Sequence, residues 1–205
     1  MTVHEWWALL FQQVMETDWL QWVAVGAGVA EVLLAWADNI WLYPAGIIGT
    51  VLTICILFDA QLYAESCLNV YYAVASVYGW WYWSRRKDRP PVKPSYSNTR
   101  EWSITVAISV LGTAGIWWVL QRYTPSPVPF WDALVSATAW AGTWLLTRRK
   151  VENWIVLNVS NAVAVPLLLY KHLPLFAALT VFLFVVAIFG YFGWRKEIRS
   201  VMSIS

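Results

Sequence analysis

Long apolar runs, separated by short polar or basic segments, make up most of the chain. Seven of these runs reach or approach the length of about 20 residues that an α-helix needs to cross the hydrocarbon core of a bilayer. They cover residues 20–36, 40–58, 62–83, 102–121, 131–147, 153–170 and 175–194. We therefore predict an all-α integral membrane protein with seven transmembrane helices.

The N-terminal segment 1–19 differs from these runs, because its apolar side chains occupy one face of a helix. Trp6, Trp7, Leu10 and Val14 share that face, which is typical of a helix lying flat at a membrane interface. Acidic residues interrupt the stretch and no basic segment precedes an apolar core, so we expect no cleavable signal peptide. We predict a short interfacial amphipathic helix here.

The composition agrees with a membrane protein. Hydrophobic residues make up 60% of the 205 residues and charged residues only 13%, whereas a soluble domain has about a quarter charged residues. Many of the seventeen tryptophans lie at the ends of apolar runs, where indole rings anchor helices at the interface. The net charge is only +2, and the basic residues do not form the kind of pattern that binds nucleic acid.

Residue types that carry catalysis or bind metals are sparse. Cys55 and Cys67 lie in apolar runs, and neither they nor His4 and His172 have the spacing of a metal or redox site. The sequence contains no hydrolytic triad and no phosphate-binding loop. We therefore expect neither a cofactor nor an enzymatic activity.

The distribution of Lys and Arg predicts the orientation. Twelve of the fourteen basic residues fall in the segments 84–100, 148–153 and 195–205, which seven spans would place on the same side. Because short cytoplasmic loops are enriched in Lys and Arg, we predict an outside N-terminus and a cytoplasmic C-terminus. The predicted location is the bacterial inner (plasma) membrane.

The two halves of the chain resemble each other at a nearly constant offset in the numbering. Tyr78–Gly79 and Trp83 in the first half correspond to Phe189–Gly190 and Trp194 in the second. The sequence thus predicts a 3+1+3 arrangement of parallel repeats, with a site between them near the middle of the membrane. The predicted segments are an interfacial helix (1–19), a first three-helix repeat (20–83), a loop, linker helix and outer turn (84–130), a second repeat (131–194) and a tail (195–205).

Polar side chains form a stripe on the third run. Glu65, Asn69, Tyr72 and Ser76 are spaced by four, three and four positions, so a helix places them on one face. Such a stripe on an apolar helix predicts a substrate pathway. The alternative is a seam of hydrogen bonds between helices, and Glu65 could also reach the interface.

A second polar face lies on the sixth run, where Trp154, Asn158 and Asn161 share one side of the helix. Two amides are costly to place in lipid, so this face should meet protein or a cavity. We predict that it binds substrate, with packing between helices as the alternative.

The remaining candidates lie on the first and fifth runs. Glu31 is a carboxylate deep in an apolar run; it could balance a cationic substrate, carry a proton or pair with a basic residue. Ser136 and Trp140 are further pocket candidates, whereas Asp132 follows a proline turn and is expected to cap a helix. Carboxylates, amides and aromatic rings together suit a small cationic heteroaromatic solute.

Four linked motifs resemble those of the PnuC-type vitamin transporters. They are DNIWLYPAGIIG, LYAESCLNVYYAVASVYGWWYW, SPVPFWDA and RRKVENW…N…LYKHL, and they occur in the same order across residues 26–194. The resemblance implies a 3+1+3 fold like that of SWEET transporters and a homotrimer in membrane lipid. It also implies facilitated diffusion by a uniporter, with a cytoplasmic vitamin kinase trapping the solute.

Members of this family move nicotinamide riboside, thiamine or riboflavin. The riboside carriers have a W-x-x-W-x-x-x-N/D pattern, which Trp154 and Asn161 match here, whereas Leu157 replaces the second tryptophan. On this difference we predict thiamine as the substrate, with nicotinamide riboside as the alternative. A membrane receptor that binds the solute without moving it is the alternative from another class.

Overall fold

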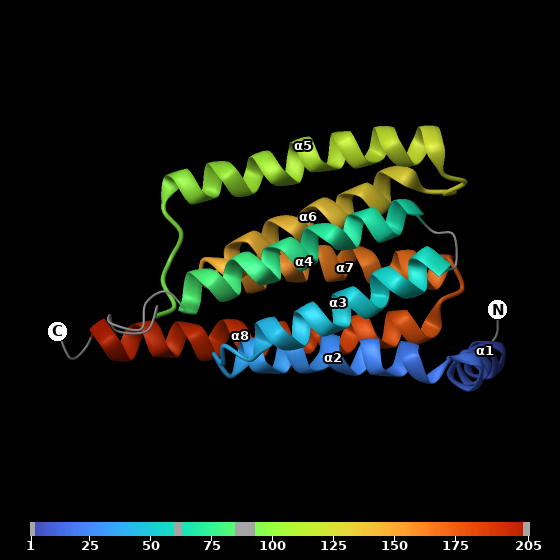
Figure 1. Ribbon diagram of the computed structural model, residues 1–205, viewed down its shortest axis with the longest axis horizontal. Coiled ribbons are helices and arrows are strands. Elements are labelled where there is room, and N and C mark those ends of the chain that lie inside the picture. The colour runs from blue at the N-terminus through green and yellow to red at the C-terminus, as the bar shows by residue number, and fades with distance from the viewer. Residues whose placement is uncertain (1–2, 60–62, 85–92, 203–205) are drawn as a thin grey trace.

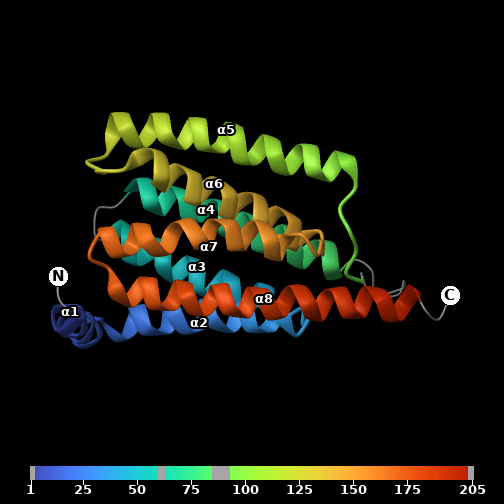
Figure 2. The same cartoon turned by 180° about the vertical axis from the view of Figure 1, so that it is seen from behind.

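The computed structural model describes residues 3–59, 63–84 and 93–202, and these ranges contain eight α-helices. Figures 1 and 2 show α2 to α8 running side by side, with α1 crossing one end of the bundle. The helices are α1 (Val3–Glu16), α2 (Trp19–Trp36), α3 (Leu42–Asp59), α4 (Tyr63–Ser84), α5 (Thr99–Tyr123), α6 (Pro129–Thr147), α7 (Asn153–Tyr170) and α8 (Pro174–Met202).

Each predicted run coincides with one helix, and the differences lie at the ends. α5 begins at Thr99, because Asn98 and Glu101 form a reciprocal capping box at its first turn. α8 continues past residue 194 to Met202, where Ile198 packs into the core and neither Gly nor Pro interrupts the helix. Among the described helices, α2, α5, α7 and α8 are long and apolar enough to cross a bilayer.

One local prediction is wrong. Asp132 does not cap α6, whose N-cap is Val128 with Pro129 in the first turn. Asp132 lies one turn further along, where its carboxylate pairs with Lys171 at 2.6 Å and accepts a hydrogen bond from Ser126. Proline already fixes the start of the helix, so the carboxylate is free to join α6 to the α7–α8 turn.

Six of the helices form a closed ring. Consecutive pairs α2–α3, α3–α4, α6–α7 and α7–α8 pack together, and the contacts α4–α6 and α2–α8 join the two triplets. α5 lies on α6 at one side of this ring (Figure 1). The two triplets, α2–α4 and α6–α8, therefore meet along two matching seams.

Equivalent residues of the two triplets make matching contacts. The indole nitrogen of Trp83 donates to the carbonyl of Thr147 at the end of α6, and that of Trp194 donates to the carbonyl of Ala35 at the end of α2, both at 3.2 Å. Gly79 and Gly190 are equally matched, since a Cβ on either would overlap a ring, that of Tyr43 or that of Trp154 respectively.

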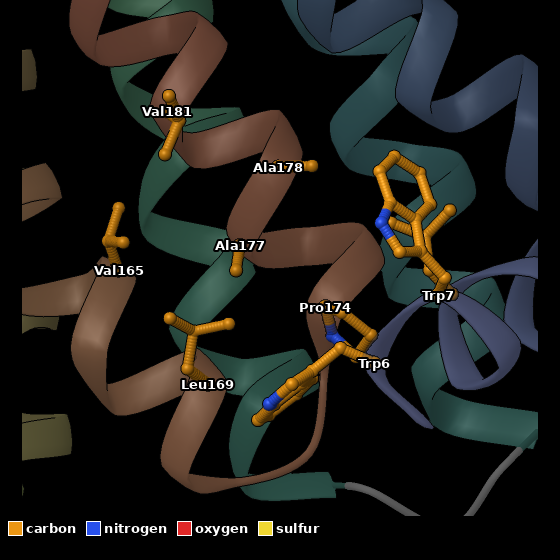
Figure 3. A pocket seen from close by; sticks show the side chains of 9 residues that line it. Trp6, Trp7, Val165, Leu169, Pro174, Ala177, Ala178 and Val181 are labelled. Carbon is orange, nitrogen blue, oxygen red and sulfur yellow. The ribbon is translucent and has the colours of Figure 1, made fainter. Parts of the chain in front are cut away.

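α1 packs on the outer surface of α8 at the end opposite the C-terminus. Gln13 holds it there: its amide nitrogen donates to the carbonyl of His172 at 2.9 Å, and its amide oxygen accepts from the backbone of Leu175. A cavity of about 320 Å³ lies between α1 and helices α7 and α8 (Figure 3). Its lining is apolar, with Trp6 on one side and residues such as Val165 on the other, so it offers no group for a charged solute.

Candidate functional site

Glu31 on α2 is the carboxylate that the ring brings between its helices. It is half-buried and lies directly against Gly46 of α3, where a Cβ would overlap its side chain. Glu31 is also close enough to Tyr43 on α3 and Tyr72 on α4 to interact electrostatically with both. Three helices of the first triplet thus place one acidic and two phenolic side chains together.

Tyr71 connects this group to the second triplet. Its ring contacts Tyr72, with centroids 5.8 Å apart, and its centroid lies 4.8 Å from that of Trp140 on α6. Its hydroxyl donates to the carbonyl of Trp140 at 2.9 Å. Two predicted site residues, Tyr72 and Trp140, are therefore linked by a residue that the sequence analysis did not select.

The other candidates on α4 and α6 lie near this group. Ser76 is buried one turn beyond Tyr72, and Ser136 is half-buried one turn before Trp140. Asn69 is half-buried on α4. Glu65 belongs to α4, but its side chain lies outside the described residues.

The residues of the predicted face of α7 differ in burial. Trp154 is 1% exposed and packs edge-on against Trp194, in the same core cluster as Tyr43. Asn158 and Asn161 are half-buried, and the amide nitrogen of Asn161 lies 3.5 Å from the oxygen of Asn158. Trp154 and Asn158 both line a groove of about 310 Å³ between α7 and α8. The indole ring and the first amide therefore border the same groove, although the ring is almost fully buried and the amide is not.

Several buried donors have no hydrogen-bond acceptor within the described part of the chain. On the helices they are the hydroxyl of Tyr43 and the indole nitrogens of Trp140, Trp144 and Trp154. A buried donor without a partner is costly, and a polar solute or water could supply the missing acceptor. These groups lie on α3, α6 and α7, around the junction of the two triplets.

The two triplets differ at the position of the Glu31 carboxylate. The positions of the second triplet equivalent to Glu31 and Gly46 are Gly142 and Leu157. A Cβ on Gly142 would lie 2.7 Å from the Leu157 side chain, so the large and small partners are exchanged between α6 and α7. The first triplet therefore carries a carboxylate at the place where the second carries an aliphatic side chain.

Three residues of this group were not selected from the sequence as site residues. Tyr43 is the repeat equivalent of Trp154, so the repeat itself could have identified it. Tyr71 gave no such signal, because a tyrosine in an apolar run is equally typical of packing. Gly46 makes room for Glu31, and that role depends on how the two helices pair.

The bundle defines the class of protein: a helical membrane protein with polar and aromatic side chains at the junction of two similar triplets. A family model described as "Nicotinamide mononucleotide transporter" matches residues 18–196. The chain belongs to this family, which confirms the predicted PnuC-type resemblance. The family is one of membrane transporters and not of enzymes.

Curated relatives and a solved structure agree with this assignment. The "Nicotinamide riboside transporter PnuC" of Escherichia coli (strain K12) is 24% identical over 210 residues, which cover 90% of this chain and 88% of the relative. The protein of the same name from Neisseria mucosa is 25% identical over 197 residues, covering 89% and 74%. The fold is similar to "Crystal structure of the Vitamin B3 transporter PnuC", with a TM-score of 0.72, 24% identity and coverage of 98% and 94%.

Proposed function

We propose that the protein is a uniporter that moves nicotinamide riboside across the membrane by facilitated diffusion. The observation that carries this proposal is the Glu31 carboxylate, which lies against Gly46 inside the first triplet and interacts electrostatically with Tyr43 and Tyr72. A carboxylate can balance the fixed positive charge of a pyridinium ring, and aromatic side chains can stack on its face. No cofactor is needed for such a cycle.

The choice of nicotinamide riboside replaces the thiamine predicted from the sequence. The thiamine prediction depended on Leu157, which stands where riboside carriers have a second tryptophan. The relatives that match most of this chain are named for nicotinamide riboside, and they support the alternative that the sequence analysis kept. Aromatic contacts from Tyr43 and Tyr72 compensate, in this proposal, for the missing indole.

The binding residues follow from this site. We infer that Glu31 and Tyr72 hold the pyridinium ring, and that Trp140, Ser136 and Ser76 line the adjoining wall on α6 and α4. The further candidates are Glu65, Asn69, Trp154, Asn158 and Asn161. Of these, the two amides of α7 would contact the ribose hydroxyls, which require hydrogen-bond partners when buried.

The proposed architecture is seven spans in a 3+1+3 order, with α2–α4 and α6–α8 as parallel repeats and α5 as the linker. The matching contacts of Trp83 and Trp194 support it. We further propose an outside N-terminus, a homotrimer, and trapping of the vitamin by a cytoplasmic kinase, as the family resemblance implies. α5 exposes Val106, Val110 and Leu111, an apolar surface suited to lipid or to another copy of the chain.

Titration calorimetry on the purified protein tests the substrate. Nicotinamide riboside should bind, and thiamine should bind more weakly, because its two rings require a differently shaped pocket. Tight thiamine binding with weak binding of the riboside would restore the preference predicted from the sequence. Nicotinic acid riboside is a matched probe: it has a carboxylate in place of the carboxamide, and repulsion from Glu31 should make it bind more weakly than nicotinamide riboside.

A further inference from the structure

A buried ion pair joins the two triplets at the end of the ring that carries the C-terminus. Asp38 lies in the turn between α2 and α3, and Arg149 lies in the turn between α6 and α7; their side chains form a salt bridge. The Arg149 side chain is 5% exposed and that of Asp38 is 21% exposed. Burial lowers the pKa of Arg149 to about 10, although Glu197 acts to raise it. The guanidinium is therefore charged at neutral pH.

The two partners occupy equivalent positions in the triplets. The repeat aligns Asp38 with Arg149, and both have a left-handed backbone, with φ of 55° at Asp38 and 53° at Arg149. Each residue follows closely the last turn of the helix before it, α2 or α6. The ion pair therefore lies where the two matching turns approach each other, at one end of the junction between the two triplets.

Aromatic side chains complete the closure around this pair. The guanidinium carbon of Arg149 lies 4.3 Å from the centroid of the Trp83 ring, in cation–π contact. Trp83 packs edge-on against Tyr43 at 5.1 Å, as Trp194 does against Trp154 at 5.5 Å. Each tryptophan hydrogen-bonds the helix end of the other triplet, so this end is sealed by contacts that cross between the triplets.

The segment that leads into α5 packs against the outer surface of the Arg149 turn. Residues 93–98, which lead into α5, run alongside it: the Ser95 amide donates to the carbonyl of Arg149 at 3.1 Å, and the Val151 amide donates to the carbonyl of Ser95 at 3.0 Å. Both carboxylate oxygens of Glu152 accept from the Ser97 amide. The Arg149 turn is thus attached to the segment before α5, whereas the Asp38 turn is not part of this attachment. If this end of the ring opened, the Arg149 turn would therefore move with that segment and away from the Asp38 turn.

We propose that Asp38 and Arg149 form the gate at this end of the transport path, and that the gate is closed in this structure. The inference rests on the proposed transport between the triplets, since a site reached alternately from two sides needs a closure at each end. Breaking a buried ion pair leaves an uncompensated charge, so the pair favours the closed state until the two turns separate together.

Labelling of a buried cysteine from the Arg149 side tests the gate without any substrate. Ser76→Cys, in a background with Cys55→Ser and Cys67→Ser, places a thiol of similar size about 10 Å, two helical turns, from Trp83 on α4. A membrane-impermeant thiol reagent should label it slowly in inside-out vesicles. Asp38→Asn or Arg149→Gln should raise the labelling rate by on the order of tenfold, because a minor open state becomes a major one.

Arg149→Lys should keep labelling slow, because it retains a cation that can pair with Asp38 beside Trp83 and Glu197. The control is Asp132→Asn, which breaks the Lys171–Asp132 pair at the opposite end and should not raise the rate from this side. Should a neutralised variant not fold, Arg149→Lys decides alone, and fast labelling of it overturns the gate. Unchanged labelling rates in Asp38→Asn and Arg149→Gln also overturn the gate. A lack of riboside exchange by the unmodified protein would overturn the proposed transport function and not the closure measured by labelling.

Discussion

Glu31 is the residue on which the proposed binding site depends, and its position is set by a neighbour with no side chain. Gly46 leaves the space that the carboxylate occupies, and Tyr43 and Tyr72 are close enough to interact with it electrostatically. At the equivalent place in the second triplet the space is filled by Leu157 instead. The carboxylate therefore occurs in one triplet alone at this pair of positions, although the backbone is similar in both.

Replacing Glu31 by Gln should weaken the binding of nicotinamide riboside. A hydrogen bond or contact to a charged group contributes about 1.5–3 kcal/mol, so we expect a loss of roughly 10- to 150-fold in affinity. Calorimetry on the two proteins measures it, with Glu16→Gln on the exposed end of α1 as the control. Equal affinities for the wild type and Glu31→Gln would contradict the role of this carboxylate.

Gly46→Ala should also lower riboside affinity, because the added methyl group overlaps the Glu31 carboxylate and must displace it. Gly115→Ala is the matched control, since nothing lies within 4 Å of a Cβ at that position of α5. That control should leave binding unchanged and raise helix stability by up to about 1 kcal/mol. A Gly46→Ala protein that binds as tightly as Gly115→Ala would show that Glu31 tolerates displacement.

At the scale of elements, the segment 93–98 is attached to the second triplet through side chains as well as backbone. Lys150 pairs with Glu101 of α5 at 3.1 Å and donates to the hydroxyl of Ser95. Glu152, 9% exposed, accepts from both the amide and the hydroxyl of Ser97. These contacts attach the start of α5 to the turn that carries Arg149.

Glu152→Gln should destabilise this attachment. It replaces a charged acceptor of two hydrogen bonds by an amide with one acceptor oxygen, at a cost of about 1–3 kcal/mol. Thermal unfolding in detergent, followed by tryptophan fluorescence, should show a Tm lower by on the order of several degrees. Ser103→Ala, at an exposed position of α5, is the control and should leave Tm nearly unchanged.

The sequence predicted the elements well because apolar runs of spanning length leave few alternatives to a helix. The ends were less predictable, since capping at Asn98 and packing at the end of α8 depend on local and tertiary contacts. Polarity alone selected Glu31, which the fold brings beside two tyrosines. Polarity could not select Tyr43 or Tyr71, because their contacts depend on which helices are neighbours. It also misassigned Asp132, because the partner of this carboxylate is Lys171, which follows α7 and is distant in sequence.

For the whole molecule, the two ends of the ring should face opposite sides of the membrane. In a cysteine-free background, Tyr96→Cys should react with an impermeant reagent only from the cytoplasmic side, and Tyr123→Cys only from outside. Both positions are exposed, 48% and 70% respectively, so access is limited by the membrane alone. Labelling of both from the same side would contradict the odd number of crossings between them.

The central claim is that the assembled protein exchanges nicotinamide riboside without driving its accumulation. Counterflow in kinase-free proteoliposomes tests it most directly: labelled riboside outside should enter against an excess of unlabelled riboside inside, and Glu31→Gln should slow this entry. Labelled riboside should not accumulate above equilibrium in empty vesicles under a proton or sodium gradient. Binding of riboside without any exchange would contradict the account and identify a receptor instead, and gradient-driven accumulation would contradict the uniporter.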